Sequence, residues 1–256
     1  MHLIDTHTHL FAQQFDEDRS EVIHRALEKG VKQMLLPNID SSSIQPMLNL
    51  CAEFPNNCFP MIGIHPCDIK KNYLEELEII EEWLQNEKFV AVGEIGIDLY
   101  WDKNTLSIQE DAFRKQVELA KKYKLPIAIH VRDSFDEVLA IIDELNDDYL
   151  NGVFHCFTGN EDQANHIINY GGFKLGIGGV VTFKNSDLDK TLSTISIEYL
   201  ILETDSPYLA PTPYRGKRNE SSYMILVAEK LAEIYGKSLE EVAYITTQNA
   251  KELFKI

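Results

Sequence analysis

Short stretches rich in β-forming residues alternate with longer stretches of helical periodicity along most of the chain. The short stretches are six to eight residues long, a usual length for buried strands, and the amphipathic stretches between them are long enough for helices. This alternation predicts eight strands, at residues 2–7, 32–38, 58–65, 89–95, 126–131, 152–157, 172–179 and 199–205.

Apolar residues recur at helical spacing in the segments between these strands. In residues 73–86 one face is apolar and the other carries glutamates, which predicts a helix with a solvated acidic face. The apolar positions are Leu74, Leu77, Ile80 and Leu84. Residues 107–124 and 134–146 follow the same pattern.

The sequence pattern of the C-terminal region predicts two further helices, with a break between them near Gly236. Ser238 is placed to act as the N-cap of the second one, because a serine side chain can accept from the free N–H groups of a first helical turn.

Alternating strands and helices predict a parallel sheet, and eight repeats predict that the sheet closes. We therefore expect an α/β fold consisting of one (β/α)8 TIM barrel with an extra C-terminal helix, and residues 1–256 as a single domain. A doubly wound open sheet is the alternative. The first strand-to-helix turn lacks the Gly-rich phosphate fingerprint of that fold, which weakens it.

Composition narrows the class of protein. No segment approaches the ~18 apolar residues of a membrane span, and no export signal is evident. The four cysteines form no CxxC pair, so we expect free thiols and a cytoplasmic location. The net charge of −17 argues against a general nucleic-acid binder, although it leaves room for local phosphate binding through metal ions.

Unusual polar residues stand where the predicted strands end. Five of the eight histidines are in such positions, together with two carboxylates. Because the carboxyl ends of barrel strands meet at one mouth, these side chains are expected to converge. They are His7, His9, His65, Glu94, His130, His155 and Asp205.

The first strand carries the pattern Asp5, His7, His9. Side chains two residues apart on a strand share a face, so His7 and His9 can bind one ion together. Asp5 lies deeper on that face, where we expect it to accept a proton from an imidazole and fix its tautomer. The alternative is a set of hydrogen-bonded core histidines, and the number of ligand-type residues favours metal.

Four histidines, one glutamate and one aspartate exceed the needs of a single tetrahedral ion. Two divalent cations that share the carboxylate of Glu94 fit better. Such a pair of cations activates water near neutral pH and neutralises the charge on both the attacking and the leaving oxygen of a displacement reaction. Mixed nitrogen and oxygen ligands suit Zn, Mn or Co, and Mg is possible, so the sequence leaves the metal open.

Seven motifs along the chain resemble the TatD family of metal-dependent deoxyribonucleases, which are amidohydrolase-type barrels. In order they are DTHTHL, GIHP, GEIGIDLYWD, PIAIHVRD, HCFTG, ETDSPYLAP and RGKRNE, and they cover nearly the whole chain. One departure follows the last motif, where Ser221-Ser222-Tyr223 stands in place of the family's proline.

The resemblance implies a TIM barrel that binds two divalent cations and a 3′–5′ exonuclease activity on DNA. It implies that His7, His9, Glu94 and Asp205 hold one ion, and that Glu94, His130 and His155 hold the second. It also implies that His65 lies close to the scissile phosphate.

Other residues are candidates for supporting roles. Arg132 could reach a phosphate or pair with an acid, and Arg215, Lys217 and Arg218 form a basic cluster that could bind phosphate or be solvated. Glu203 shares a face with Asp205, so we expect it to support a ligand. Further assignments are that Asp98 braces the loop after its strand, that Cys156 faces the helices, and that Tyr100 and Trp101 stack on bases or pack their loop.

The predicted function is hydrolysis of phosphodiester bonds at DNA ends or in single strands, with Asp205, Glu94 and His65 as catalytic residues. The substrate partner is DNA, and neither a membrane nor an obligate protein partner is evident. One alternative is a hydrolase of another bond, such as a D-aminoacyl-tRNA ester or a cyclic amide or lactone. The absence of a bridging lysine, with Glu94 in its place, favours the nuclease. The other alternative is a non-catalytic metal-binding scaffold, which the complete set of ligands disfavours.

Overall fold

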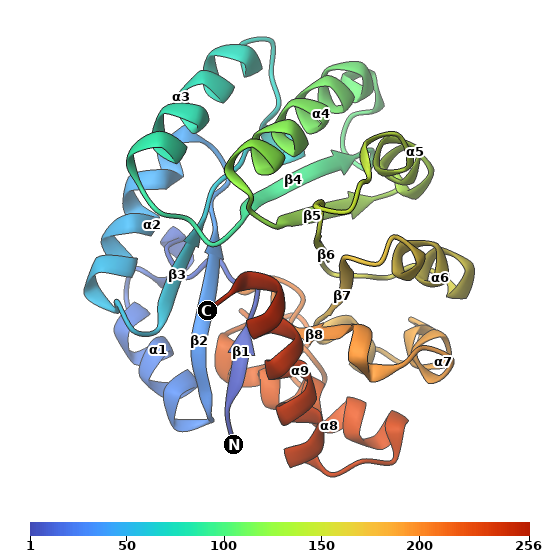
Figure 1. Ribbon diagram of the computed structural model, residues 1–256. Helices are drawn as coiled ribbons and strands as arrows, with labels where there is room; N and C mark the ends of the chain where they lie inside the picture. The colour runs from blue at the N-terminus through green and yellow to red at the C-terminus, as the bar shows by residue number, and fades with distance from the viewer.

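The computed structural model describes all residues, 1–256, and has eight parallel strands surrounded by helices (Figure 1). The strands are β1 (Leu3–Asp5), β2 (Val31–Pro37), β3 (Cys58–Met61), β4 (Val92–Asp98), β5 (Ile127–Arg132), β6 (Gly152–Phe154), β7 (Phe173–Ile177) and β8 (Leu200–Leu202). The helices are α1 (Arg19–Glu28), α2 (Ser41–Glu53), α3 (Tyr73–Asn86), α4 (Leu106–Tyr123), α5 (Phe135–Leu145), α6 (Glu161–Asn169), α7 (Leu188–Ser193), α8 (Met224–Tyr235) and α9 (Leu239–Phe254).

The strands pair in chain order, β1 to β3 in one sheet and β4 to β8 in another. Two isolated parallel bridges join the sheets, Ile62 with Val92 between β3 and β4, and Thr8 with Ser206 beyond the ends of β1 and β8. Each strand pairs with the next and the last meets the first, which is the order of a TIM barrel. This confirms the predicted fold class.

Two hydrophobic clusters hold the barrel together. The larger lies between the strands and the surrounding helices, where residues on the outer face of the strands meet the apolar faces of the helices. The smaller fills the interior of the barrel and extends to Ala250, Leu253 and Phe254 of α9. Its interior members are Ile4, Leu35, Met61, Ala91, Ala128, Val153 and Ile201.

Helix α9 closes the barrel at the amino ends of its strands. The Asn249 amide donates to the carbonyls of Ile197 and Leu200 at 3.1 and 2.8 Å, and the Thr247 hydroxyl donates to the carbonyl of His2 at 2.8 Å. Ser238 begins α9 with a capping box, because its hydroxyl accepts from the Glu241 N–H and the Glu241 side chain accepts from Ser238. The predicted break between the two last helices is also confirmed, with Gly236 in a left-handed conformation after α8.

The strand boundaries differ from those predicted at several ends. β4 continues to Asp98, so Glu94 lies inside this strand rather than at its end. β3 stops at Met61 and β8 at Leu202, well before His65 and Asp205. In α3, Leu74 is exposed in the first turn, where the predicted buried face has not yet met the core. No helix of the structure is both long enough and apolar enough to cross a bilayer.

Candidate metal centre

A cavity of about 990 Å³ opens at the carboxyl ends of the strands, and the predicted site residues meet at its floor. The residues that line it include His9, His65, Glu94, His130, His155 and Asp205. His7 lies just beneath, 1% exposed. The structure therefore brings all seven predicted strand-end residues to one place.

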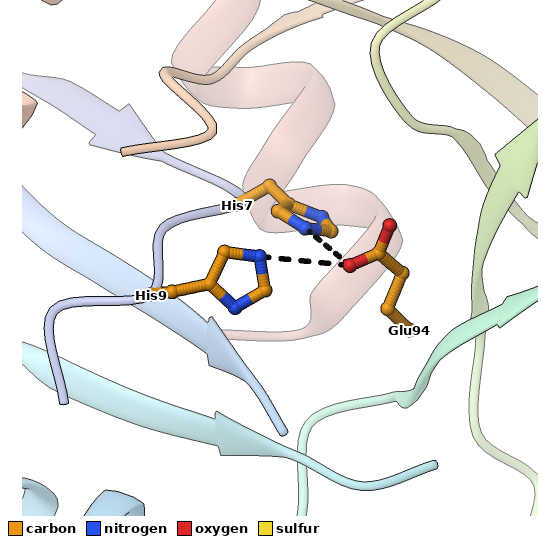
Figure 2. Close-up of side chains that lie close together, drawn as sticks. All are labelled: His7, His9 and Glu94. Atoms are coloured by element: carbon orange, nitrogen blue, oxygen red, sulfur yellow. Dashed lines mark hydrogen bonds and ion pairs between the residues drawn. The ribbon is translucent and has the colours of Figure 1, made fainter. Parts of the chain in front are cut away.

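His7 and His9 both direct Nε2 to the same oxygen of Glu94 (Figure 2). The distances to Glu94 Oε2 are 3.1 Å from His7 and 3.6 Å from His9. Asp205 Oδ1 lies 3.9 Å from His7 Nε2 and 3.6 Å from His9 Nε2. Four candidate ligand atoms thus surround one small volume.

The other Glu94 oxygen faces the remaining histidines. His130 Nδ1 lies 2.8 Å from Glu94 Oε1, His65 Nε2 lies 3.5 Å from it, and His155 Nε2 lies 3.7 Å from it. His155 also stacks on His7, with 3.4 Å between ring centroids, and its Nε2 lies 3.8 Å from Asp205 Oδ1. Each oxygen of Glu94 consequently faces its own group of imidazoles, and His155 also contacts the first group through His7.

Two further carboxylates stand behind the second group. Glu203 Oε1 lies 3.0 Å from His155 Nδ1, and Asp98 Oδ2 lies 3.0 Å from His130 Nε2. Gly176 makes room for Glu203, because a Cβ there would lie 2.2 Å from its Oε2. In each pair the carboxylate contacts one ring nitrogen of the histidine, and the other ring nitrogen faces Glu94.

Sequence reasoning found the Glu203 contact but missed the one made by Asp98. Asp98 does brace its loop as expected, because it accepts from the Tyr100 N–H at 3.0 Å. Its position four residues after Glu94 on a strand puts both carboxylates on one face, and that spacing was the available signal.

The predicted contact of Asp5 with an imidazole is wrong. Its carboxylate accepts from the Thr204 N–H at 3.0 Å and from the Thr204 hydroxyl at 2.6 Å, and it contacts His7 only through the backbone N–H at 3.4 Å. Two residues along a strand span about 6.6 Å, so Asp5 lies a layer below the imidazole of His7. Burial raises the pKa of Asp5 to about 7. Asp5 holds the segment after β8 rather than a histidine tautomer.

Cys156 also differs from its prediction. We expected it to face the helices, because His155 faces the barrel, yet it lines the cavity. β6 ends at Phe154 and Cys156 has a φ of +46°, so the alternation of a strand no longer applies there. Its backbone N–H donates to Glu203 Oε1 at 2.5 Å and helps to fix that carboxylate.

His65 has a defined role for each ring nitrogen. It precedes a short 3₁₀ turn, and its Nδ1 accepts from the Cys67 N–H at 3.1 Å. A neutral imidazole with an accepting Nδ1 carries its proton on Nε2. His65 therefore presents an N–H to the cavity, whereas a metal ligand would present a lone pair.

The pKa values of the side chains at the floor of the cavity depend on these contacts. Burial acts to raise the pKa of Glu94, but the surrounding imidazoles hold this pKa well below its ordinary value. Burial acts in the same way on Asp205, and the nearby imidazoles of His9, His155 and His7 hold its pKa below the ordinary value. For His155, burial lowers the pKa but Glu203 and the other carboxylates raise it to about 10. A bound cation would displace that proton, because a metal ligand binds in its deprotonated form.

The donor set fits divalent cations. Bond lengths of about 2.0–2.2 Å to nitrogen and oxygen place the corners of a tetrahedron about 3.4 Å apart. The four N···O distances around Glu94 Oε2 and Asp205 Oδ1 are 3.1, 3.6, 3.6 and 3.9 Å, mostly too long for hydrogen bonds but close to this spacing. Three sets of ligand atoms lie within 4.8 Å of one another. They are His7, His9 and Glu94, then His7, His155 and Glu203, and finally His65, Glu94 and His130.

Positive charge gathers at the rim of the cavity. Arg132, Arg215 and Lys217 line it, whereas Arg218 turns away to pair with Asp18 at 2.7 Å and to cover Phe15. Of the predicted basic cluster, Arg215 and Lys217 thus line the cavity, whereas Arg218 forms an ion pair outside it. Ser221 and Ser222, which replace the expected proline, are buried in a 3₁₀ turn before α8 and do not line the cavity.

Comparisons with known proteins agree with this site. The family model for TatD-related DNases matches residues 4–255. YabD of Bacillus subtilis, named as an uncharacterized metal-dependent hydrolase, is 42% identical over 255 residues that cover 99% of each chain. The 3′–5′ ssDNA/RNA exonuclease TatD of Salmonella typhimurium is 32% identical over 260 residues, again with 99% of each chain covered.

The fold agrees as well. The crystal structure of YJJV, a TatD homologue from Escherichia coli, superposes with a TM-score of 0.93 at 28% identity, covering 99% of this chain and 98% of the other. A phosphotriesterase homology protein of Escherichia coli with phosphate in its active site shares the fold, with a TM-score of 0.72 at 15% identity and 99% and 98% coverage. With a match over nearly its whole length and a complete His and carboxylate cluster, this chain belongs to the TatD-related DNase family of metal-dependent hydrolases.

Proposed function

We propose that this protein is a two-metal phosphodiesterase that acts on DNA and removes nucleotides from the 3′ end. Family membership and the name of the Salmonella relative support the choice of substrate and direction. The observation that carries the two-metal part is the division of ligands by Glu94. One oxygen faces His7 and His9, and the other faces His130, His65 and His155.

In this proposal His7, His9, Glu94 and Asp205 hold one cation, and Glu94, His130 and His155 hold the other. The cations, when bound, would activate water and neutralise charge that develops on the phosphate. Zn, Mn, Co and Mg all suit this set of ligands. Glu203 and Asp98 keep the ligating nitrogens of His155 and His130 directed to the centre.

The protein's own residues supply proton transfer and charge. Asp205 projects into the centre from a segment whose backbone is fixed by His7, since the Asp205 N–H donates to the His7 carbonyl at 2.9 Å. Its low pKa keeps it ionised, so it can orient a water molecule and accept its proton. His65 donates its Nε2–H to an oxygen of the scissile phosphate. Arg132, Arg215 and Lys217 attract the substrate locally in a protein of net charge −17.

The test uses purified protein loaded with one divalent metal at a time. Single-stranded and duplex DNA labelled at the 3′ or the 5′ end, and a panel of small esters and lactones, would be incubated with it. We expect stepwise shortening from the 3′ end, and elemental analysis should find about two ions per chain. A limit of one ion at saturating metal would refute the bridging role of Glu94. Turnover of esters or lactones with no cleavage of DNA would refute the nuclease.

A further inference from the structure

Asp205, whose carboxylate reaches the candidate metal centre, has a left-handed backbone conformation. Its φ is +57°, a value that residues other than glycine rarely adopt, because the Cβ then comes too close to the following carbonyl oxygen. Asp205 also lies beyond β8, which ends at Leu202. The direction of its carboxylate therefore depends on the contacts that fix the peptide group on either side of it.

Both of these peptide groups are hydrogen-bonded. In the group before Asp205, the Thr204 carbonyl accepts from the Asn219 side chain at 2.8 Å. The N–H of the same group, which belongs to Asp205, donates to the His7 carbonyl at 2.9 Å. In the group after it, the Asp205 carbonyl accepts from the Tyr208 N–H at 2.7 Å and closes a turn. Asn219 contributes to this arrangement from outside both the turn and the residues that line the cavity.

The amide of Asn219 bonds to both ends of the turn. Its Nδ2 donates to the Tyr208 carbonyl at 2.7 Å as well as to the Thr204 carbonyl, and its backbone N–H donates to the Pro207 carbonyl at 2.9 Å. Its Oδ1 accepts from the Glu220 N–H at 2.9 Å, which fixes the orientation of the amide. One NH₂ group supplies two N–H donors for two carbonyls, and an ionised aspartate of the same size supplies none.

Asn219 is held in place by its own neighbours. Its side chain is completely buried. Arg218 pairs with Asp18 at the start of α1 at 2.7 Å, and Glu220 pairs with Arg25 of α1 at 2.6 Å. A side chain between two anchored residues keeps a fixed position, so its two hydrogen bonds can hold the turn in one conformation.

We propose that Asn219 is a positioning residue for the reaction. Through the carbonyls of Thr204 and Tyr208 it holds the left-handed backbone of Asp205, and thereby keeps Asp205 Oδ1 3.6 Å from His9 Nε2 at the centre. Asn219 acts through Asp205 and touches neither the ligands nor the substrate. The proposal rests on the proposed function, in which Asp205 binds a cation and accepts a proton from water.

Asn249 provides a matched control at the opposite end of the barrel. It is also a buried asparagine whose Nδ2 donates to two carbonyls, those of Ile197 and Leu200. Asn219→Ala and Asn249→Ala should both lower the free energy of unfolding, because each leaves two carbonyls without their donor. Only the change at Asn219 should reach the metal centre.

The turn itself can be observed by hydrogen exchange with mass spectrometry on metal-free protein. Peptides that cover residues 204–209 include the N–H groups of Asp205 and Tyr208, which are bonded within this arrangement. They should exchange faster in Asn219→Ala than in wild type, and at the wild-type rate in Asn249→Ala. This measurement requires neither metal nor substrate.

Ion affinity and turnover report on the carboxylate. In calorimetric titrations, Asn219→Ala should weaken one metal-binding event about 10- to 100-fold. Its kcat on DNA should fall on the order of 10²-fold, because a small displacement of a reacting group has an effect of this size. In the double variant with Asp205→Asn, the affinity for metal should be no weaker than in Asp205→Asn alone, since a residue that acts through Asp205 has nothing left to position. Asn249→Ala should match wild type in affinity and kcat.

Wild-type ion affinities in Asn219→Ala would overturn the proposal. So would effects equal to those of Asn249→Ala, or effects that add to those of Asp205→Asn. Asn219→Asp and Asn249→Asp remove the same donors without leaving a cavity, and they take the place of the alanine variants if either of these does not fold. Failure of the wild-type protein to cleave any phosphodiester would contradict the proposed function, whereas hydrogen exchange and ion titration would still decide the role of Asn219.

Discussion

In the proposed two-ion centre, Glu94 is the residue that both ions share. It is 2% exposed, lies inside β4, and has imidazoles on both of its oxygens. Glu94→Gln keeps the shape of the side chain but removes its negative charge from both ion sites. We expect kcat to fall on the order of 10³-fold or more at saturating metal. Steady-state assays with elemental analysis would measure both activity and ion content.

The fold should survive this change, because an amide of equal size leaves no cavity. His24→Gln is the control, since His24 is an exposed residue of α1 outside the cavity, and it should be near neutral. Activity of Glu94→Gln within tenfold of wild type at equal metal loading would refute the two-metal assignment.

Substitution of Asp98 should weaken the binding of one ion and leave the binding of the other unchanged. Its Oδ2 lies 3.0 Å from His130 Nε2, which leaves His130 Nδ1 as the nitrogen that faces Glu94. In Asp98→Asn the negative charge that holds this tautomer is lost. We expect the affinity for one of the two ions to fall about 10- to 100-fold, as is usual for such a change behind a ligand. Calorimetric titration with metal resolves the two binding events.

The matched control for this prediction is a second aspartate–histidine pair. Asp143 Oδ1 lies 2.8 Å from His166 Nε2 at the outer surface of α5 and α6, and Asp143→Asn should leave both affinities unchanged. Two metal-binding events in Asp98→Asn with wild-type affinities would show that Asp98 only braces its loop.

At the scale of elements, ion pairs fasten the loop after β8 to α1. Asp18, at the start of α1, pairs with Arg218 at 2.7 Å and Arg25 at 3.2 Å, and Arg25 also pairs with Glu220 at 2.6 Å. These contacts fix the part of the loop that follows Arg215, which lines the cavity. The hydrogen bond from Arg218 is the main cause that lowers the pKa of Asp18 to about 2.

Asp18→Asn should therefore reduce the free energy of unfolding at pH 7. Because Asp18 is partly exposed, solvent screening limits the loss to about 1 kcal/mol. A lowered pKa in the folded state stabilises above the ordinary pKa of 3.8, and this contribution is lost as the pH falls through the folded value of about 2. Urea unfolding of both proteins at pH 7 and pH 3 should show the difference shrinking at the lower pH.

Asp187→Asn serves as the control, because Asp187 pairs with Lys190 at the surface and its side chain is 74% exposed. It should have almost no effect at either pH. A difference between Asp18→Asn and wild type that stays constant from pH 7 to pH 3 would show that the ion pairs do not account for the loss.

The hydrophobic pattern predicted an element well where its buried face and its backbone hydrogen bonds belong to the same helix or strand. Helix 73–86 matches α3, and its apolar spacing records the face that packs on the barrel. Strand ends were less predictable, because residues 203–205 are mostly buried like strand residues, yet not all of their backbone N–H groups donate to the backbone of a neighbouring segment. The Thr204 N–H, for example, donates to the Asp5 side chain.

The same distinction explains which residues of the site could be predicted from the sequence. His7 and His9 were predictable from alternation, since both direct Nε2 to Glu94 although β1 itself ends at Asp5. Cys156 and Asp5 were not, because a left-handed residue redirects the first and a distant segment supplies the donors for the second. Contacts that depend on segments far apart in sequence require the fold.

For the whole molecule, stability and chemistry are located at opposite ends of the barrel. The interior cluster and α9 fill the end at the amino termini of the strands, and the ligands occupy the carboxyl end. The side chains at the floor also contact one another directly, as in the hydrogen bonds between Glu94 and the histidines His7 and His130. The barrel therefore has a complete core that does not include the ligands.

A chelator should abolish hydrolysis without unfolding the protein. We expect the far-ultraviolet circular dichroism at 25 °C to be unchanged by EDTA, and activity to return when a divalent metal is added back. The melting temperature should fall by several degrees, because a ligand that binds only the folded state stabilises it by an amount that grows with its concentration over Kd. Calorimetric scans at several metal concentrations measure this shift. Collapse of the dichroism on chelation at room temperature would mean that the ions hold the fold together, and the separation of core and ligands would then be wrong.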